Sequence, residues 1–127
     1  MNQGAHVSVV LRFRDGRTER RSMTPDFDLE RETVHVVNDD QTVEQIPFAE
    51  LKAVFFPRTN WAPEGTEPEL QGSVLSVEFA DGEVIRGCAP DYSPQRHGFF
   101  LFPMDRSKNE KVFVVNSAIV SIDVEKL

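Results

Sequence analysis

The stretch Val9-Val-Leu-Arg-Phe-Arg-Asp-Gly16 recurs in the second half of the chain as Leu75-Ser-Val-Glu-Phe-Ala-Asp-Gly82. An arginine and then a Pro-Asp-aromatic triplet follow each copy at nearly equal spacing: Arg20 and Pro25-Asp-Phe27 in the first, Arg86 and Pro90-Asp-Tyr92 in the second. Self-similarity at a fixed spacing indicates a duplicated structural unit, here of about 50 residues.

Apolar and polar residues alternate within each copy, as in a strand that buries one face. Val7, Val9, Leu11 and Phe13 form the apolar set of the first copy, and Leu75, Val77 and Phe79 form that of the second. Asp-Gly is the dipeptide that best tolerates the backbone of a tight hairpin turn, so each copy predicts a β-hairpin. The second strands of these hairpins are expected at Arg17–Ser22 and Glu83–Cys88.

Further apolar runs rich in Val, Ile and Phe predict the remaining strands. They lie at 34–37, 43–48 and 51–56 in the first copy, and at 99–102, 112–115 and 118–124 in the second. Helix is expected only as one turn near Phe48–Lys52. The sequence therefore predicts an all-β protein with units at residues 5–57 and 73–127.

The segment 58–72 between the copies has the proline, glycine and glutamate content of a linker. It has no counterpart in the repeat and is longer than an ordinary loop, so it is either a connector or a functional loop. Trp61 lies in its middle. This side chain either fixes the linker to one unit or anchors a binding partner.

Composition restricts the classes of partner. The formal net charge of −7 repels a phosphate backbone unless a local basic patch overcomes it. No apolar run approaches the roughly 20 residues of a membrane span, and Met1–His6 lacks the features of a signal peptide. Cys88 is the single cysteine, which fits a reducing compartment as either a buried hydrophobe or a reactive thiol. We expect a cytoplasmic protein that does not bind membranes.

The second copy resembles the Sm family. Val77-Glu-Phe-Ala-Asp-Gly-Glu-Val-Ile-Arg-Gly87, followed by Asp91, is similar to the first Sm motif, and Val112-Phe-Val-Val-Asn-Ser-Ala-Ile-Val-Ser-Ile-Asp-Val124 is similar to the second. The resemblance covers about 50 residues, and the first copy departs from it with Arg21 at the position of Gly87. It implies two pseudo-repeated, small SH3-like or Sm-like barrels packed together, a fold that often assembles into rings.

Sm proteins grip RNA with an asparagine in the first motif and an Arg-Gly pair in the second. Gln95, Arg96 and His97 stand near the first position here, and Val115-Asn116 stands at the second. The resemblance therefore supports the fold and not RNA binding. The Asp-Gly, Pro-Asp-aromatic and Leu51-Lys-Ala-Val-Phe-Phe56 patterns are also similar to an uncharacterised bacterial domain found beside receiver and PilZ domains, which implies a regulatory context.

Catalytic and metal chemistry have little support in the sequence. The three histidines are scattered and one cysteine is available, so we expect no metal and no cofactor. Ser93 lies near Asp91 and His97, but residues of one loop seldom form a catalytic triad. We expect a protein that is not an enzyme.

The one dense basic cluster consists of Arg12, Arg14, Arg17, Arg20 and Arg21. Arg17 and Arg21 have the RxxxR spacing with which PilZ domains clamp cyclic di-GMP, and the Asp91–Gly98 loop partly resembles their second motif. The alternative is a hairpin of solvated arginines. The matching hairpin of the second copy is acidic, so the two units could instead pair with one another, within a chain or between chains.

The leading functional hypothesis is a non-catalytic protein-interaction or adaptor module in bacterial signalling, with sheet edges open to a second copy or to an added peptide strand. Its partner is expected to be a protein, and the chain itself could form a homo-oligomer. The alternative is nucleotide, cyclic dinucleotide or RNA binding through the arginine cluster. The candidate binding residues are Arg12, Arg14, Arg17, Arg20, Arg21, Trp61, Asp91, Tyr92, Arg96 and His97.

Overall fold

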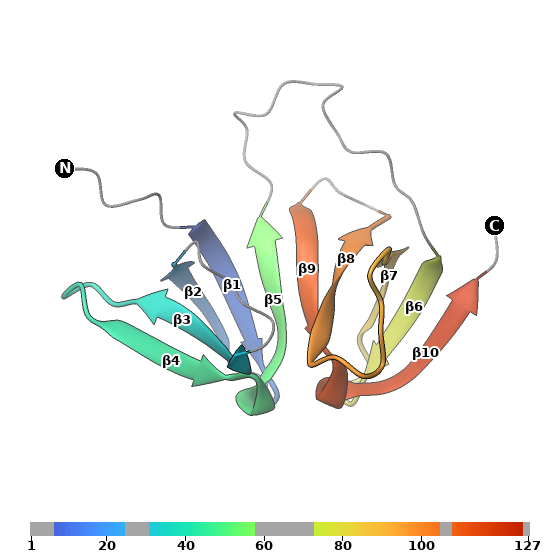
Figure 1. Ribbon diagram of the computed structural model, residues 1–127, viewed down its shortest axis with the longest axis horizontal. Helices are drawn as coiled ribbons and strands as arrows, with labels where there is room; N and C mark the ends of the chain where they lie inside the picture. Colours follow the sequence, from blue (N-terminus) through green and yellow to red (C-terminus); the bar gives the residue numbers. More distant parts are fainter. Residues whose placement is uncertain (1–6, 25–30, 58–72, 105–107, 126–127) are drawn as a thin grey trace, which may run out of the picture.

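The computed structural model describes residues 7–24, 31–57, 73–104 and 108–125. Within these residues ten antiparallel strands form one sheet, in the order β10-β6-β7-β8-β9-β5-β1-β2-β3-β4 (Figure 1). The strands are β1 (Val7–Phe13), β2 (Thr18–Met23), β3 (Thr33–Val37), β4 (Val43–Pro47), β5 (Leu51–Pro57), β6 (Val74–Phe79), β7 (Val84–Cys88), β8 (Gly98–Pro103), β9 (Asn109–Val115) and β10 (Ile119–Glu125). The all-β prediction is confirmed.

The strand order of the first half recurs in the second half. β5-β1-β2-β3-β4 corresponds to β10-β6-β7-β8-β9, and in Figure 1 the two curved halves lie side by side. A short 3-10 helix precedes the last strand of each half, η2 (Phe48–Glu50) before β5 and η3 (Asn116–Ala118) before β10. The first of these is the single helical turn that the sequence predicts near Phe48.

Both Asp-Gly turns adopt the same hairpin geometry. Gly16 and Gly82 have φ angles of 98° and 91°, a region that glycine enters without steric cost. Phe13 N–H donates to Arg17 O at 2.9 Å, and Phe79 N–H donates to Glu83 O at 3.0 Å. One left-handed glycine closing a three-residue loop explains why the two segments form the same turn.

The halves are joined by a strand pair rather than by packing of two closed barrels. β5 pairs with β9 along Ala53↔Val114, Val54↔Phe113, Phe55↔Val112 and Phe56↔Lys111. The hydrogen-bond ladder therefore runs from one half into the other, and the sheet does not close: β4 and β10 are its two edges. The sequence predicts two barrels packed together, and the structure shows instead one open sheet whose halves share the β5–β9 ladder.

Two hydrophobic clusters lie on opposite faces of this junction. Val54, Phe56 and Phe113 belong to the cluster of the first half, whereas Phe55 and Val112 belong to that of the second. Strands buried on both faces have continuous rather than alternating apolar sequences. This explains why 51–56 and 112–115 are almost uninterrupted apolar runs.

Gly87 is required where β7 meets β8. A Cβ atom at this position would lie 2.3 Å from Phe102 O, well inside van der Waals contact. β7 and β8 share a register of two residue pairs, as do β2 and β3 at the corresponding place in the first half. Close backbone approach in a short pairing explains the glycine that follows Arg86.

Candidate functional site

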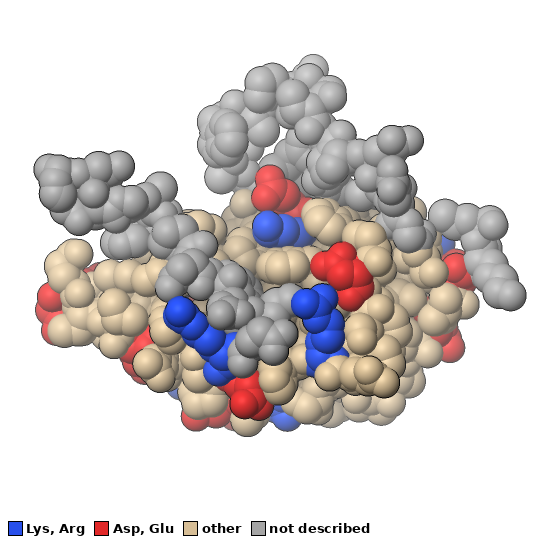
Figure 2. All heavy atoms as spheres, in the orientation of Figure 1, with Lys and Arg blue, Asp and Glu red and all other residues tan. Residues whose placement is uncertain are grey.

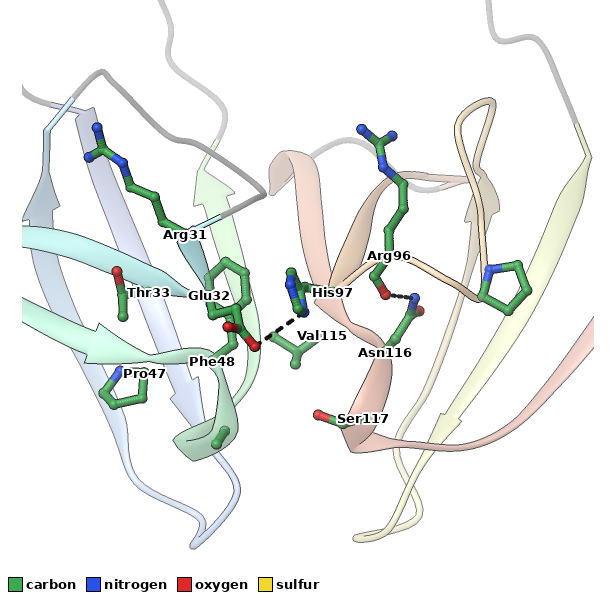
Figure 3. Close-up of a pocket in the computed structure, with 12 residues that line it drawn as sticks. Arg31, Glu32, Thr33, Pro47, Phe48, Arg96, His97, Val115, Asn116 and Ser117 are labelled. Carbon is green, nitrogen blue, oxygen red and sulfur yellow. Dashed lines mark hydrogen bonds and ion pairs between the residues drawn. The ribbon is translucent and has the colours of Figure 1, made fainter.

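A groove of about 680 Å³ lies where the two halves meet. Each half contributes a segment before its third strand and the region of its 3-10 helix (Figure 3). The lining residues are Arg31, Glu32, Thr33, Pro47, Phe48 and Ala49 from the first half, and Pro94, Arg96, His97, Val115, Asn116 and Ser117 from the second. The groove is therefore built from equivalent parts of the repeat.

Backbone hydrogen bonds fix the two sides of the groove in matching ways. Phe48 N–H donates to Glu32 O at 2.8 Å, and Asn116 N–H donates to His97 O at 2.9 Å. Glu32 and His97 are thus counterparts in the two halves. Glu32 has a φ of 60°, which is a strained backbone conformation for a residue other than glycine. Residues with such strain cluster at functional sites.

Asn116 shapes the second side. Its Nδ2 group donates to Ser93 O at 2.9 Å and to Arg96 O at 2.7 Å. These bonds hold the loop before β8 against η3 and set the position of Arg96 and His97. Asn116 therefore stabilises the loop with its side chain, at the position where the Sm resemblance expects the glycine of the Arg-Gly pair.

Basic side chains gather around the groove. In Figure 3, Arg31 and Arg96 rise on opposite sides of it, and Glu32 and His97 point toward one another between them. His97 Nδ1 lies 3.6 Å from Glu32 Oε1, with exposed side-chain fractions of 43% and 67%. This contact is an ion pair only when the imidazole is protonated. In Figure 2, Lys and Arg side chains lie on both sides of the middle of this face, with acidic side chains beside them.

The floor of the groove is apolar. The buried Phe48 ring lies edge-on to the His97 ring at 6.3 Å between centroids, and it contacts Phe113 at 5.2 Å. Val115 is also buried. Apolar walls with a few convergent polar groups are typical of ligand sites, and the volume lies in the usual range for them.

The arginine cluster of the first hairpin divides into separate contacts. Arg14 donates to Leu51 O at 2.9 Å and to Ser117 Oγ at 2.5 Å, so it links the halves. Arg17 pairs with Asp15 at 2.8 Å. Arg20 is exposed and lines a separate hollow.

Arg21 is held among acidic and amide groups of its own half. It lies 3.0 Å from Glu19 and 3.1 Å from Glu44, and it donates to Asn38 Oδ1 at 2.5 Å. Desolvation opposes the charged form of Arg21, but the hydrogen bonds that its guanidinium donates to Glu44 and Glu19 outweigh it and raise the pKa of Arg21. The RxxxR spacing of Arg17 and Arg21 therefore coincides with two guanidinium groups that already pair with carboxylates.

Charge pairing joins the two units, as the opposite charges of their hairpins suggest. Arg12 Nη1 lies 3.0 Å from Glu83 Oε1, and its guanidinium lies over the Phe55 ring at 5.0 Å. Lys52 Nζ lies 2.7 Å from Asp81 Oδ2 and also contacts Glu83. Acidic side chains of the β6–β7 hairpin thus dock onto basic side chains of β1 and β5.

The remaining sequence-derived candidates have mixed positions. Tyr92 packs edge-on against Phe99 at 4.9 Å between centroids and contributes to the core of the second half. Asp91 is exposed outside the groove, whereas Arg96 and His97 line it. Trp61 lies outside the described residues.

Sequence reasoning missed Arg31, Glu32 and Lys52. Lys52 is the lone charge in an apolar run, which signals a buried counter-charge, but no sequence pattern pairs it with Asp81 in the other half. Arg31 and Glu32 line the groove only because the fold brings the η2 and η3 regions to the same groove.

Metal-ligand clusters and membrane-spanning helices are absent from the described ranges. No group of three or more His, Cys, Asp or Glu side chains gathers there in a way that could hold a metal ion. Within the same ranges no helix combines the length and apolar character needed to cross a bilayer. Cys88 is buried.

Comparison with known proteins gives a family. Residues 5–126 match a family of unknown function, DUF6982, and the chain belongs to it. Neither the curated proteins nor the solved structures include a match.

Proposed function

We propose that this protein is a non-catalytic binding module whose inter-unit groove holds a short acidic segment of a partner protein. The supporting observation is the gathering of Arg31, Arg96 and His97 around an apolar floor in a chain whose net charge is −7. Guanidinium groups bind carboxylates with charge-assisted hydrogen bonds, which favours an acidic ligand. The buried Phe48 and Val115 give apolar side chains of the same segment a surface to contact.

Glu32 supports an acidic ligand in a second way. Its carboxylate already lies 3.6 Å from His97 inside the groove. A partner carboxylate at the same place would meet His97, and Arg31 and Arg96 line the groove on either side of it. Glu32 then acts as an internal competitor for the partner, and removing its charge should strengthen binding.

The two halves of the sheet and the cellular role of the adaptor are part of the same proposal. We interpret β1–β5 and β6–β10 as Sm-like or SH3-like units, on the basis of their shared strand order and Asp-Gly turns. The adaptor would act in the cytoplasm, in bacterial signalling. Its expected lack of catalytic activity is part of the proposal.

Fluorescence polarisation with a labelled glutamate-rich peptide that also contains leucine and phenylalanine tests this proposal. We expect Arg96→Ala to weaken binding by about tenfold, since a hydrogen bond to a charged group contributes roughly 1.5 kcal/mol or more. Glu32→Gln should tighten binding. A peptide with glutamine in place of glutamate should bind weakly, and equal binding of both peptides would refute the electrostatic argument.

Nucleotide, cyclic dinucleotide or RNA binding through Arg12, Arg14, Arg17, Arg20 and Arg21 is the second candidate. Its candidate site is the hollow that Arg20 and Arg21 line, where the carboxylates of Asp39, Asp40 and Glu44 oppose a phosphate ligand. Cyclic di-GMP and oligo-uridine titrations at increasing salt test it, because phosphate contacts weaken steeply with salt.

Arg20→Ala and Arg96→Ala are reciprocal controls for the two candidates. The groove proposal predicts that Arg96→Ala alone weakens the peptide complex. The phosphate candidate predicts that Arg20→Ala alone weakens the nucleotide complex. Nucleotide binding that depends on Arg20, with no peptide binding, would replace the first proposal with the second.

A further inference from the structure

The two halves of the repeat are joined by one strand pair, and the equivalent strands at the two edges of the sheet do not form this pair within the chain. Inside the molecule, the last strand of the first half, β5, pairs with the fourth strand of the second half, β9. Among the strands that the structure describes, the corresponding ones without this pairing are β10 and β4, the two sheet edges. We propose that copies of this chain associate head to tail, with β10 of one copy pairing with β4 of the next.

The correspondence between the halves fixes the register of this pairing. Aligning η2 with η3 matches the residues of β5 to those of β10. The pairing of β5 with β1 shifts register at Lys52, and the pairing of β10 with β6 shifts register at the corresponding residue, Val120. Transferring the β5·β9 register then places Val124 opposite Val43 and Asp123 opposite Glu44.

The free edges carry exposed apolar side chains, and this register would bring Val124 and Val43 together. Val43 is 54% exposed, Val124 is 57% exposed and Val120 is 62% exposed. Among the described residues these are three of the five exposed large hydrophobic side chains, the others being Val84 and Met104. Cross-strand apolar pairs stabilise antiparallel sheets, so the pairing covers a surface that the single chain leaves in water.

Charge complementarity gives a second, independent argument. Inside the chain, Arg12 on β1 pairs with Glu83 on the β6–β7 hairpin at 3.0 Å. The Asp-Gly turns align Arg12 with Glu78 and Glu83 with Arg17. In the contact between copies, Glu78 would therefore meet Arg17 from the β1–β2 hairpin of the neighbour. Compared with the Arg12–Glu83 pair, the acidic and basic residues change sides, and the Glu78–Arg17 contact is still between opposite charges.

One feature of the edges opposes association. Asp123 and Glu44 are both acidic, and like charges directly opposite one another destabilise a strand pair. Arg21 lies 3.1 Å from Glu44 and offsets part of this repulsion. The β5·β9 junction has the buried pair Phe55 and Val112 at the same place. The contact between copies is therefore weaker than the internal one, and it is reversible.

Sedimentation velocity over a range of concentrations tests the contact. We expect the weight-average mass to rise above the 14.4 kDa of one chain as concentration increases. Asp123→Asn should shift this rise to lower concentration because it removes the like-charge pair. Head-to-tail contacts are not self-complementary, so they produce closed rings or open filaments, and either product supports the proposal.

A charge exchange identifies the surfaces. Arg17→Glu should raise the dissociation constant by about fivefold or more, because it replaces an attractive contact with a repulsive one. Combining Arg17→Glu with Glu78→Arg should restore association. Lys108→Glu makes the same change of charge at an exposed position outside β4, β10 and both Asp-Gly hairpins, and it should leave association intact.

Three outcomes would overturn the proposal. The first is a mass of one chain at every concentration for both the wild type and Asp123→Asn. The second is equal loss of association in Arg17→Glu and Lys108→Glu, which would indicate a general charge effect. The third is failure of the Arg17→Glu and Glu78→Arg pair to recover association while circular dichroism shows a folded protein.

Discussion

Lys52 and its counter-charges should differ sharply in what their removal costs. The Lys52 side chain is 6% exposed, and its ammonium lies 4.8 Å from the centre of the Phe79 ring. Asp81 and Glu83 have side-chain exposures of 58% and 34%. The cation is therefore buried at the junction of the halves, whereas the acids that neutralise it reach solvent.

The cost of a variant depends on which charge is left behind. Leaving the buried Lys52 ammonium without a counter-charge costs about 3 to 5 kcal/mol, as measured when one partner of a buried ion pair is removed. We expect that loss when Asp81→Asn and Glu83→Gln are combined. Lys52→Met removes the buried charge itself and keeps an unbranched apolar stem, so it should change the free energy of unfolding by less than about 1 kcal/mol.

Urea unfolding of the two variants measures this asymmetry. A loss of 3 to 5 kcal/mol is a large part of the roughly 5 to 15 kcal/mol that stabilises a small domain, so the unfolding midpoint should fall strongly for the double variant alone. Asp15→Asn combined with Glu125→Gln is the matched control, because these acids face Arg17 and Arg86, whose side chains are 54% and 47% exposed. Equal losses for Lys52→Met and the Asp81, Glu83 double variant would refute the reasoning.

Three further predictions follow from the same contacts. The hydrogen bond from Lys52 holds the pKa of Asp81 below its usual 3.8, so the stability it contributes is complete above pH 3.8 and is lost as the pH falls through the lower native value. Unfolding midpoints measured from about pH 5 to pH 2 should thus fall more steeply in the wild type than in Lys52→Met, and parallel curves would contradict this. Gly87→Ala forces a Cβ atom to 2.3 Å from Phe102 O and should cost about 1 to 3 kcal/mol, visible as a lower thermal midpoint. Phe113→Ala empties a fully buried site and should cost about 3 to 5 kcal/mol in the same scan, and a smaller loss than that of Gly87→Ala would argue against its central place in the core.

The candidate site was only partly predictable. Arg96 and His97 were identified from a loop that departs from the Sm pattern, and both line the groove. Arg12 was identified as a ligand-binding candidate, yet it pairs with Glu83 of the other half. The sequence pattern around a charged residue is the same whether its side chain faces solvent, a ligand or a distant carboxylate. Which of these it contacts depends on which strands lie next to one another.

The sequence alone determined the local structure of each half. Alternating apolar residues and two Asp-Gly turns specify the hairpins, because side-chain period and backbone preference act over a few neighbouring residues. Only the tertiary structure decided that β5 joins β9, which makes one open sheet, buries Lys52 and brings Glu32 to His97. Contacts of this kind join residues far apart in the chain, and their free energy comes from burial and charge pairing that exist only after the halves meet.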